Sequence, residues 1–172
     1  MELKFTVNGY ISKPVHEVFE AVANPKHLSQ FFTTGGAKGR LESGAVVTWD
    51  FHDFPGAFPV NVVEVEQDKK IVLRWDAAEH VVDPEAAGAR QTTVTMTFEP
   101  VDGDRTLVNI SEYGWKSSEE GLQASYGNCM GWTGMLAAMK AWMEYGINLR
   151  EGFYKQSRPH IATCLIPWHI DH

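Results

Sequence analysis

Apolar and polar residues alternate with a period of two through most of the chain up to Gly114. This period is typical of half-buried β-strands, because successive side chains of a strand point to opposite faces of a sheet. Residues 3–11 predict the first strand. Its apolar positions are Leu3, Phe5, Val7 and Ile11. From residue 35 onward the same period predicts six further strands, separated by Gly, Pro and Asp. They cover residues 37–41, 45–52, 58–66, 70–76, 91–100 and 105–114.

A helical period replaces the alternation directly after the first strand. Pro14 opens one short helix, and Asn24-Pro25 is typical of the start of a second one. The apolar residues of the two helices are Val15, Val18, Phe19 and Val22, then Leu28, Phe31 and Phe32. The later strands are joined by short connections, which favour an antiparallel meander. Residues 77–90 form the one long connection, and a loop of this length is either a binding element or a solvated insertion.

A long apolar helix is predicted after the last strand, over about residues 118–151. Ser117-Ser118-Glu119-Glu120 reads as a capping box in which Ser117 bonds the amide of Glu120. The apolar stripe recurs at helical spacing, at Trp132, Leu136, Met139 and Met143. A single helix with such a stripe must bury it on the sheet. Four glycines interrupt the helix although each costs about 1 kcal/mol relative to Ala. Close backbone approach and space for a ligand both remain open as reasons for Gly127, Gly131, Gly134 and Gly146.

The length of 172 residues suits one domain with a sizeable core, which we expect over residues 1–156. The remaining residues, 157–172, are too apolar for a plain disordered tail. Their large apolar residues include Ile161, Leu165, Ile166 and Trp168. We therefore expect this tail to dock on its own chain or on a partner subunit, which would make a homodimer.

The formal net charge of −7 argues against nucleic acid or a membrane surface as the main partner, because both bind clusters of Lys and Arg. No apolar run approaches the length of about 20 residues that spans a bilayer. Cys129 and Cys164 are isolated thiols, and the chain shows no secretory signal. A reducing, cytoplasmic location is therefore expected.

Signatures of catalysis are mostly absent, and we assign no catalytic residue, no metal ligand and no cofactor. There is no phosphate-binding loop ending in Gly-Lys-Ser, no Gly-x-Ser-x-Gly and no Cys-x-x-Cys. The segment His16-Glu17-Val18-Phe19-Glu20 begins like a zinc-binding helix, but Glu20 stands where the second histidine would be.

Several polar residues lie on predicted strands beside apolar ones. Asp50 and His52 share one face of a strand, while Trp49 and Phe51 share the other. An inward Asp50 and His52 could perform acid–base work, but alternation favours burial of the aromatic face. Arg74 and Glu112 could likewise anchor a ligand inside a pocket. Exposure on the outer face of the sheet is the default expectation for both residues.

The order strand, helix, helix, six strands, long helix resembles the START-like (SRPBCC) superfamily with its helix-grip fold, over residues 1 to about 155. The branch related to the activator of the heat-shock-protein-90 ATPase is the most similar. The residues that carry the resemblance are Asn24-Pro25, Gly44, Arg105-Thr106-Leu107, Gly131-Trp132 and Leu136. Phe31-Phe32 in place of Trp-Phe, and a single glycine in Glu42-Ser43-Gly44, depart from the family pattern.

The resemblance implies an α+β fold: a curved antiparallel sheet of six to seven strands, two short helices after the first strand, and a long C-terminal helix across the sheet. It also implies a cleft between sheet and helix, which the superfamily uses for apolar molecules. The first hypothesis is therefore the binding of a small, largely apolar ligand, without catalysis. The expected lining is Trp49, Phe51, Trp75, Met96, Phe98, Tyr126, Cys129, Trp132, Leu136 and Met139.

Two alternatives belong to other classes of protein. One is a stress-related accessory protein that regulates the ATPase of a chaperone. The other is an enzyme of the cyclase or hydrolase type that uses Asp50, His52 or Tyr126.

Overall fold

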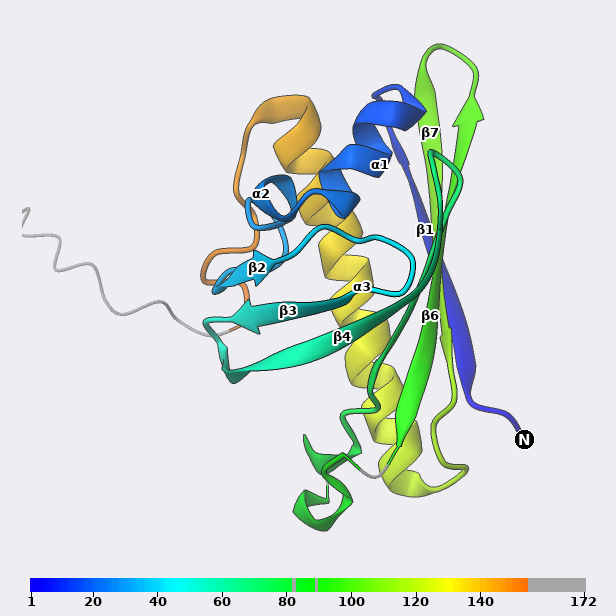
Figure 1. The fold of residues 1–172 in the computed structure, drawn as a ribbon, viewed down its shortest axis with the longest axis vertical. Coiled ribbons are helices and arrows are strands. Elements are labelled where there is room, and N and C mark those ends of the chain that lie inside the picture. The colour runs from blue at the N-terminus through cyan, green and yellow to red at the C-terminus, as the bar shows by residue number, and fades with distance from the viewer. Residues whose placement is uncertain (82, 89, 155–172) are drawn as a thin grey trace, which may run out of the picture.

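A computed structural model describes residues 1–81, 83–88 and 90–154. These residues form one curved antiparallel sheet that wraps around a long helix, as the helix-grip resemblance implies (Figure 1). The strands are β1 (Lys4–Ile11), β2 (Gly36–Lys38), β3 (Val46–Phe51), β4 (Phe54–Glu66), β5 (Lys70–Asp76), β6 (Gln91–Val101) and β7 (Arg105–Tyr113). The helices are α1 (Val15–Ala23), α2 (Pro25–Leu28) and α3 (Glu119–Tyr145), with 3₁₀ turns η1 (Glu79–Val81) and η2 (Pro84–Ala86).

The strand order is β1-β7-β6-β5-β4-β3-β2, and every neighbouring pair is antiparallel. The meander from β2 to β7 follows from the short connections that the sequence predicts. β1 adds to the far side of β7, with Lys4 opposite Tyr113 and Ile11 opposite Thr106. The two short helices α1 and α2 lie at one end of α3, where α1 packs on β6 and β7 and α2 on β2 (Figure 1). The predicted α+β fold class is confirmed.

The core lies between the sheet and the helices, and the period of two along the strands builds it. On β6, Val94, Met96 and Phe98 are each at most 2% exposed. On β7, Val108 and Ile110 are fully buried. On α3, the predicted stripe is confirmed, because Trp132 is 1% and Leu136 6% exposed. Met139 is also buried, and Met143 is half-buried.

The structure corrects both predicted ends of the long helix. Ser118, not Ser117, is the N-cap, and its hydroxyl accepts a hydrogen bond from the amide of Gly121 at 3.2 Å. The Ser117 hydroxyl instead donates to the carbonyl of Met1. The helix ends at Tyr145 rather than near 151, because Gly146 takes a left-handed conformation with φ 68° and closes the last turn.

Smaller boundary differences have local causes. β4 begins at Phe54 rather than at 58, because a tight two-residue turn joins it to β3. α2 ends at Leu28, and Phe31 and Phe32 lie in the turn that follows it. The connection 77–90 contains η1 and η2 and is fixed at both ends, since the amide of Ala77 donates to the carbonyl of Arg90.

None of the helices in the described part of the chain is long and apolar enough to cross a membrane. The prediction that residues 157–172 dock on protein falls outside the described residues.

Candidate functional site

Glu112 is a fully buried carboxylate near the end of β7, on the face of the sheet that α3 covers. Its Oε1 accepts hydrogen bonds from Trp75 Nε1 at 2.8 Å, Thr92 Oγ1 at 2.5 Å and Asn128 Nδ2 at 2.9 Å. Its Oε2 accepts one from Trp132 Nε1 at 2.8 Å. The donors come from β5, β6 and α3, so one carboxylate joins three strands to the long helix.

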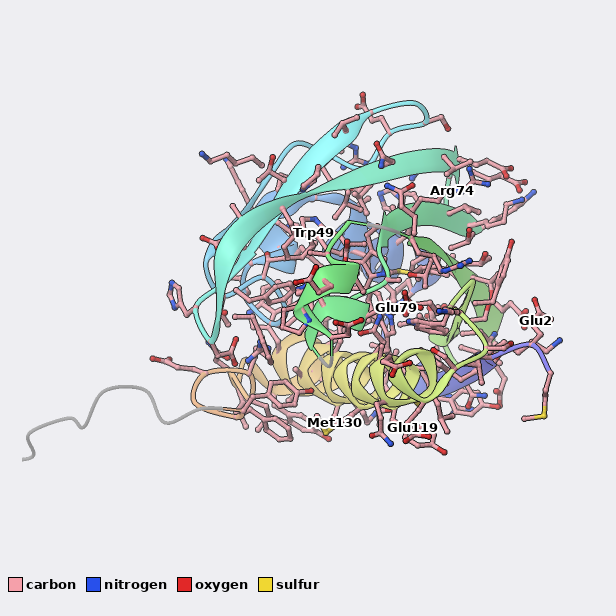
Figure 2. All side chains as sticks on the ribbon, turned by 90° about the horizontal axis from the view of Figure 1, so that it is seen from below. Glu2, Trp49, Arg74, Glu79, Glu119 and Met130 are labelled. Carbon is pink, nitrogen blue, oxygen red and sulfur yellow. The ribbon has the colours of Figure 1, made fainter. Side chains whose placement is uncertain are left out.

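The position of Glu112 follows from the pleat of β7. Val108, Ile110 and Glu112 are spaced two apart and therefore point to the same face. The sequence contains this signal, but the default expectation of exposure for Glu112 is wrong. For Arg74 the same default is correct, since it lies between the inward Leu73 and Trp75 and points outward (Figure 2).

The four partners of Glu112 are all uncharged, and this sets its electrostatics. Burial raises the pKa of Glu112 above its ordinary value, while the hydrogen bonds from Thr92, Trp75, Trp132 and Asn128 lower it in part. The net direction is upward, so the surroundings favour the protonated carboxyl relative to water.

Aromatic rings fill the space between Glu112 and the β3 side of the sheet. Trp75 lies 5.2 Å from Trp132 and 5.8 Å from Trp49, measured between ring centroids. Phe32, from the turn after α2, stacks on Trp132 at 5.2 Å and contacts Trp49 and Phe51 edge to face at 5.5 and 5.0 Å. We call Phe32, Phe51, Trp49, Trp75 and Trp132 the aromatic cluster.

One polar atom within this cluster lacks a partner. Trp49 Nε1 is buried, and no described atom accepts a hydrogen bond from it. A buried donor left unsatisfied costs about 1–3 kcal/mol. Trp49 itself is 1% exposed and lies between the sheet and α3, so solvent does not reach this donor (Figure 2).

The structure brings together most of the residues that the sequence predicts as a ligand lining. Those that are buried or half-buried between sheet and helix are Trp49, Phe51, Trp75, Met96, Phe98, Trp132, Leu136 and Met139. Cys129 is half-buried on α3, whereas Tyr126 is 59% exposed. Among residues that sequence reasoning left out of the lining, Phe32 and Glu112 are central to the site.

The groups considered for acid–base chemistry do not meet in this interior. Asp50 points away from the aromatic face of β3 and lies against Gly35, where an added Cβ would come within 2.6 Å of Asp50 Cγ. His52 is exposed in the turn after β3. No group of three or more His, Cys, Asp or Glu side chains within the described ranges could hold a metal ion.

A second carboxylate, that of the half-buried Asp53, adjoins the aromatic cluster at Phe51. Asp53 accepts two hydrogen bonds from the guanidinium of Arg150, at 2.6 and 2.8 Å, and both side chains are at most 10% exposed. Arg150 also lies over the rings of Phe51 and Tyr154, at 5.6 and 4.7 Å from their centroids. The segment after α3 is thereby fixed to the β3–β4 turn.

The hollows that the described residues form most clearly lie outside the aromatic cluster. An open groove of about 460 Å³ runs between α1, α2 and the end of α3, where His27 packs against Trp142. A hollow of about 30 Å³ lies beneath Arg150 and Tyr154. Neither of these two hollows is lined by a residue of the aromatic cluster.

Comparisons with known proteins agree with this architecture. The profile of the family described as "Activator of Hsp90 ATPase homolog 1-like protein" matches residues 12–144, which is more than half of the chain. No curated protein matches the sequence.

Among solved structures, a protein from Staphylococcus saprophyticus is similar over 86% of this chain and 96% of its own, at 22% identity and a TM-score of 0.68. The Aha1 dimer from Colwellia psychrerythraea is similar over 84% of this chain and 98% of its own, at 16% identity and a TM-score of 0.64. DynU16, a protein in the dynemicin biosynthetic locus, is similar over 86% of this chain and 49% of its own, at 20% identity and a TM-score of 0.70. At these identities the likeness concerns the fold.

Proposed function

This chain belongs to the family of Activator of Hsp90 ATPase homolog 1-like proteins, and its long helix covers one face of its sheet. We propose that it binds a small, largely apolar ligand between the sheet and this helix. The ligand carries a hydrogen-bond acceptor and lies against the aromatic cluster. Binding sites of this kind combine apolar walls with a few convergent polar groups. Here the walls are aromatic rings, and the polar group available to the ligand is Trp49 Nε1.

The observation that carries the proposal is the buried indole N–H of Trp49, for which the described residues provide no acceptor. Glu112 already receives four donors, so it positions Trp75 and Trp132 rather than offering a free acceptor. Trp49, by contrast, has a donor to give. A carbonyl or ether oxygen on an apolar ligand would satisfy it and recover the cost of its burial.

Phe32 determines how a ligand enters. Its ring contacts three other rings of the aromatic cluster, yet its backbone lies in the turn after α2 and not in the sheet. Movement of that turn withdraws the ring without breaking a strand pair. The ligand then occupies the space that Phe32 leaves beside Trp132.

The test uses two naphthalenes of similar shape. 2-Acetylnaphthalene has a carbonyl acceptor, and 2-ethylnaphthalene has none. Binding is followed by tryptophan fluorescence and by native mass spectrometry, which also detects any apolar molecule that copurifies. We expect both probes to bind Phe32→Ala more tightly than the unsubstituted chain, with the ketone bound several-fold more tightly than the hydrocarbon. Trp49→Phe in that background should abolish the preference while retaining the ring.

The matched control is Phe153→Ala, which removes a ring that is 62% exposed and outside the aromatic cluster. It should leave probe binding unchanged. If Phe32→Ala binds neither probe and no apolar molecule copurifies, the proposal is wrong.

Membership of the family favours a second candidate, an accessory role at the ATPase of a chaperone. Addition of the chain to a chaperone of the Hsp90 class should then change its basal ATPase rate. A flat response up to stoichiometric excess would contradict this role. Because a structural relative is described as a dimer, sedimentation of the same sample also tests self-association of this chain.

A further inference from the structure

The side of α3 that faces away from the sheet carries no charge over nineteen residues. Between Gly121 and Met139 the sequence contains no Asp, Glu, Lys or Arg. Exposed positions recur there every three or four residues, and we call them the α3 outer face: Gln123, Tyr126, Gly127, Met130, Thr133 and Ala137. Met130 is 57% exposed, and Figure 2 shows it on the side of α3 away from the sheet. An exposed helix face of a soluble domain is normally polar or charged.

Glycines on this side of α3 leave open space above the helix. At Gly127 and Gly131, no atom of the described residues lies within 4 Å of where a Cβ would be. Each glycine costs about 1 kcal/mol relative to Ala within a helix. The described contacts give no packing reason for these two. Gly134 shows what such a position can accept, since the Tyr154 hydroxyl lies 2.5 Å from where its Cβ would be.

The segment after α3 already leads the chain onto this face. Arg150 fixes it to Asp53, and the Tyr154 hydroxyl donates to the carbonyl of Met130 at 3.3 Å. The last described residue, Tyr154, is therefore seated beside Met130, in the middle of the α3 outer face.

The sequence beyond Tyr154 has the composition that would complement this face. It contains five large apolar residues, Ile161, Leu165, Ile166, Trp168 and Ile170. Among residues 157–172 the formal charges of Arg158 and Asp171 cancel, so the segment suits a face that carries no charge.

We propose that residues 157–172 bind along the α3 outer face of their own chain, from Thr133 toward Tyr126. The path is short, because eight residues of helix span about 12 Å. Six residues of extended chain reach about 20 Å. A tethered segment has an effective concentration in the millimolar range, so the same chain is favoured over a second copy as the occupant.

The test combines a truncation with a point substitution in a double-mutant cycle. The chain is ended after Gln156, Met130 is replaced by Lys, and both changes are then combined. Thermal midpoints and sedimentation are measured for all four proteins. Met130→Lys keeps good helix propensity on an exposed site, so it should fold. Val63→Lys serves as the matched control, because Val63 is 48% exposed but lies on β4.

The truncation and Met130→Lys should each lower the thermal midpoint by about 2–4 °C, the shift that corresponds to about 1 kcal/mol in a chain of this size. Met130→Lys should have no further effect in the truncated chain, whereas any effect of Val63→Lys should be the same in both. Additive effects, or unchanged midpoints, would overturn the proposal. A dimer that becomes a monomer on truncation would also overturn it, since the segment would then bind a second copy.

Discussion

The two carboxylates beside the aromatic cluster, the buried Glu112 and the half-buried Asp53, are stabilised in opposite ways. Glu112 is held by four uncharged donors from β5, β6 and α3, and burial raises its pKa. Asp53 is held by the two-pronged guanidinium of Arg150. Burial of a charge requires either a counter-charge or enough hydrogen bonds to replace water. This chain uses a counter-charge for Asp53, where the segment after α3 meets the β3–β4 turn, and hydrogen bonds for Glu112, between the sheet and α3.

The largest effect is expected from breaking the ion pair. Arg150→Ala should destabilise the fold by about 3–5 kcal/mol, because it removes the cation from a buried pair. Chemical denaturation measures the loss. Arg150→Lys retains the charge but not the paired geometry, so it should recover part of the stability. Equal losses in both variants would mean that stacking on Phe51 and Tyr154, and not the charge, holds the segment.

Truncation of a buried apolar side chain gives a reference for the losses of stability expected at Arg150 and Glu112. Leu136 lies on the buried stripe of α3 and is 6% exposed. Leu136→Ala should cost about 2–5 kcal/mol, the usual range for deletion of a large core side chain. Equilibrium unfolding in urea decides it. A loss below about 1 kcal/mol would show that the helix tolerates empty space beneath it.

Glu112→Gln tests whether the four uncharged donors stabilise the buried carboxylate. The amide oxygen can still accept from Trp75, Thr92 and Asn128, but the amide nitrogen then faces the N–H of Trp132. One donor is left unsatisfied, so the variant should lose about 1–3 kcal/mol at pH 5. Adding Trp132→Phe to the Gln variant removes the unsatisfied N–H and should recover part of the lost stability. If Glu112→Gln is neutral at pH 5, the four-donor arrangement is not what stabilises the carboxyl.

The pH dependence of the same pair of proteins should separate Glu112 from the other carboxylates. Since the folded pKa of Glu112 is raised above its ordinary value of 4.5, its contribution is fully present below that pH and is lost as pH rises through the folded pKa. The advantage over Glu112→Gln should therefore shrink with rising pH, by about 1.4 kcal/mol for each pKa unit of the shift.

Glu20 should behave in the opposite way, because its hydrogen bond from Arg40 lowers its pKa. Its contribution is present above the unfolded pKa and is lost on acidification. Both proteins of the pair retain Glu20, so it cancels from the difference. An advantage that grows with pH would mean that the pKa of Glu112 is lowered in the fold.

The smallest effect is expected at the start of the helix that supplies Asn128 and Trp132 to Glu112. Ser118→Ala should cost about 0.5–2 kcal/mol by removing the N-cap acceptor of the Gly121 amide. Ser117→Ala is the matched control. Its hydroxyl donates to the exposed carbonyl of Met1, so the change should cost less. A reversed order of the two losses would reassign the cap.

Much of the architecture could be predicted because it depends on local periodicity. The order of elements, the stripe at Trp132 and Leu136 and the inward face of β3 all follow from which residues lie two or three to four apart. The burial of Glu112 was available from the same rule, since it is in phase with Val108 and Ile110. Exposure was predicted instead, because carboxylates are seldom fully buried.

The cap of α3 could not be decided from the sequence, because Ser117 and Ser118 are adjacent and both suit the position. The choice depends on the backbone: Ser118 is extended just before the first helical turn, while Ser117 reaches Met1 at the other end of the described chain. The helix end at Tyr145 had a clearer signal in Gly146, which the apolar residues beyond it obscured.

By itself the sequence determined the helix-grip fold and the aromatic character of the space between sheet and helix, because period and composition are properties of neighbouring residues. The tertiary structure alone decided that Phe32 fills that space, that the Trp49 donor has no acceptor among the described residues, and that Arg150 meets Asp53. These are contacts between segments far apart along the chain. Their distances depend on how the whole sheet curves around α3, and no local pattern encodes that curvature.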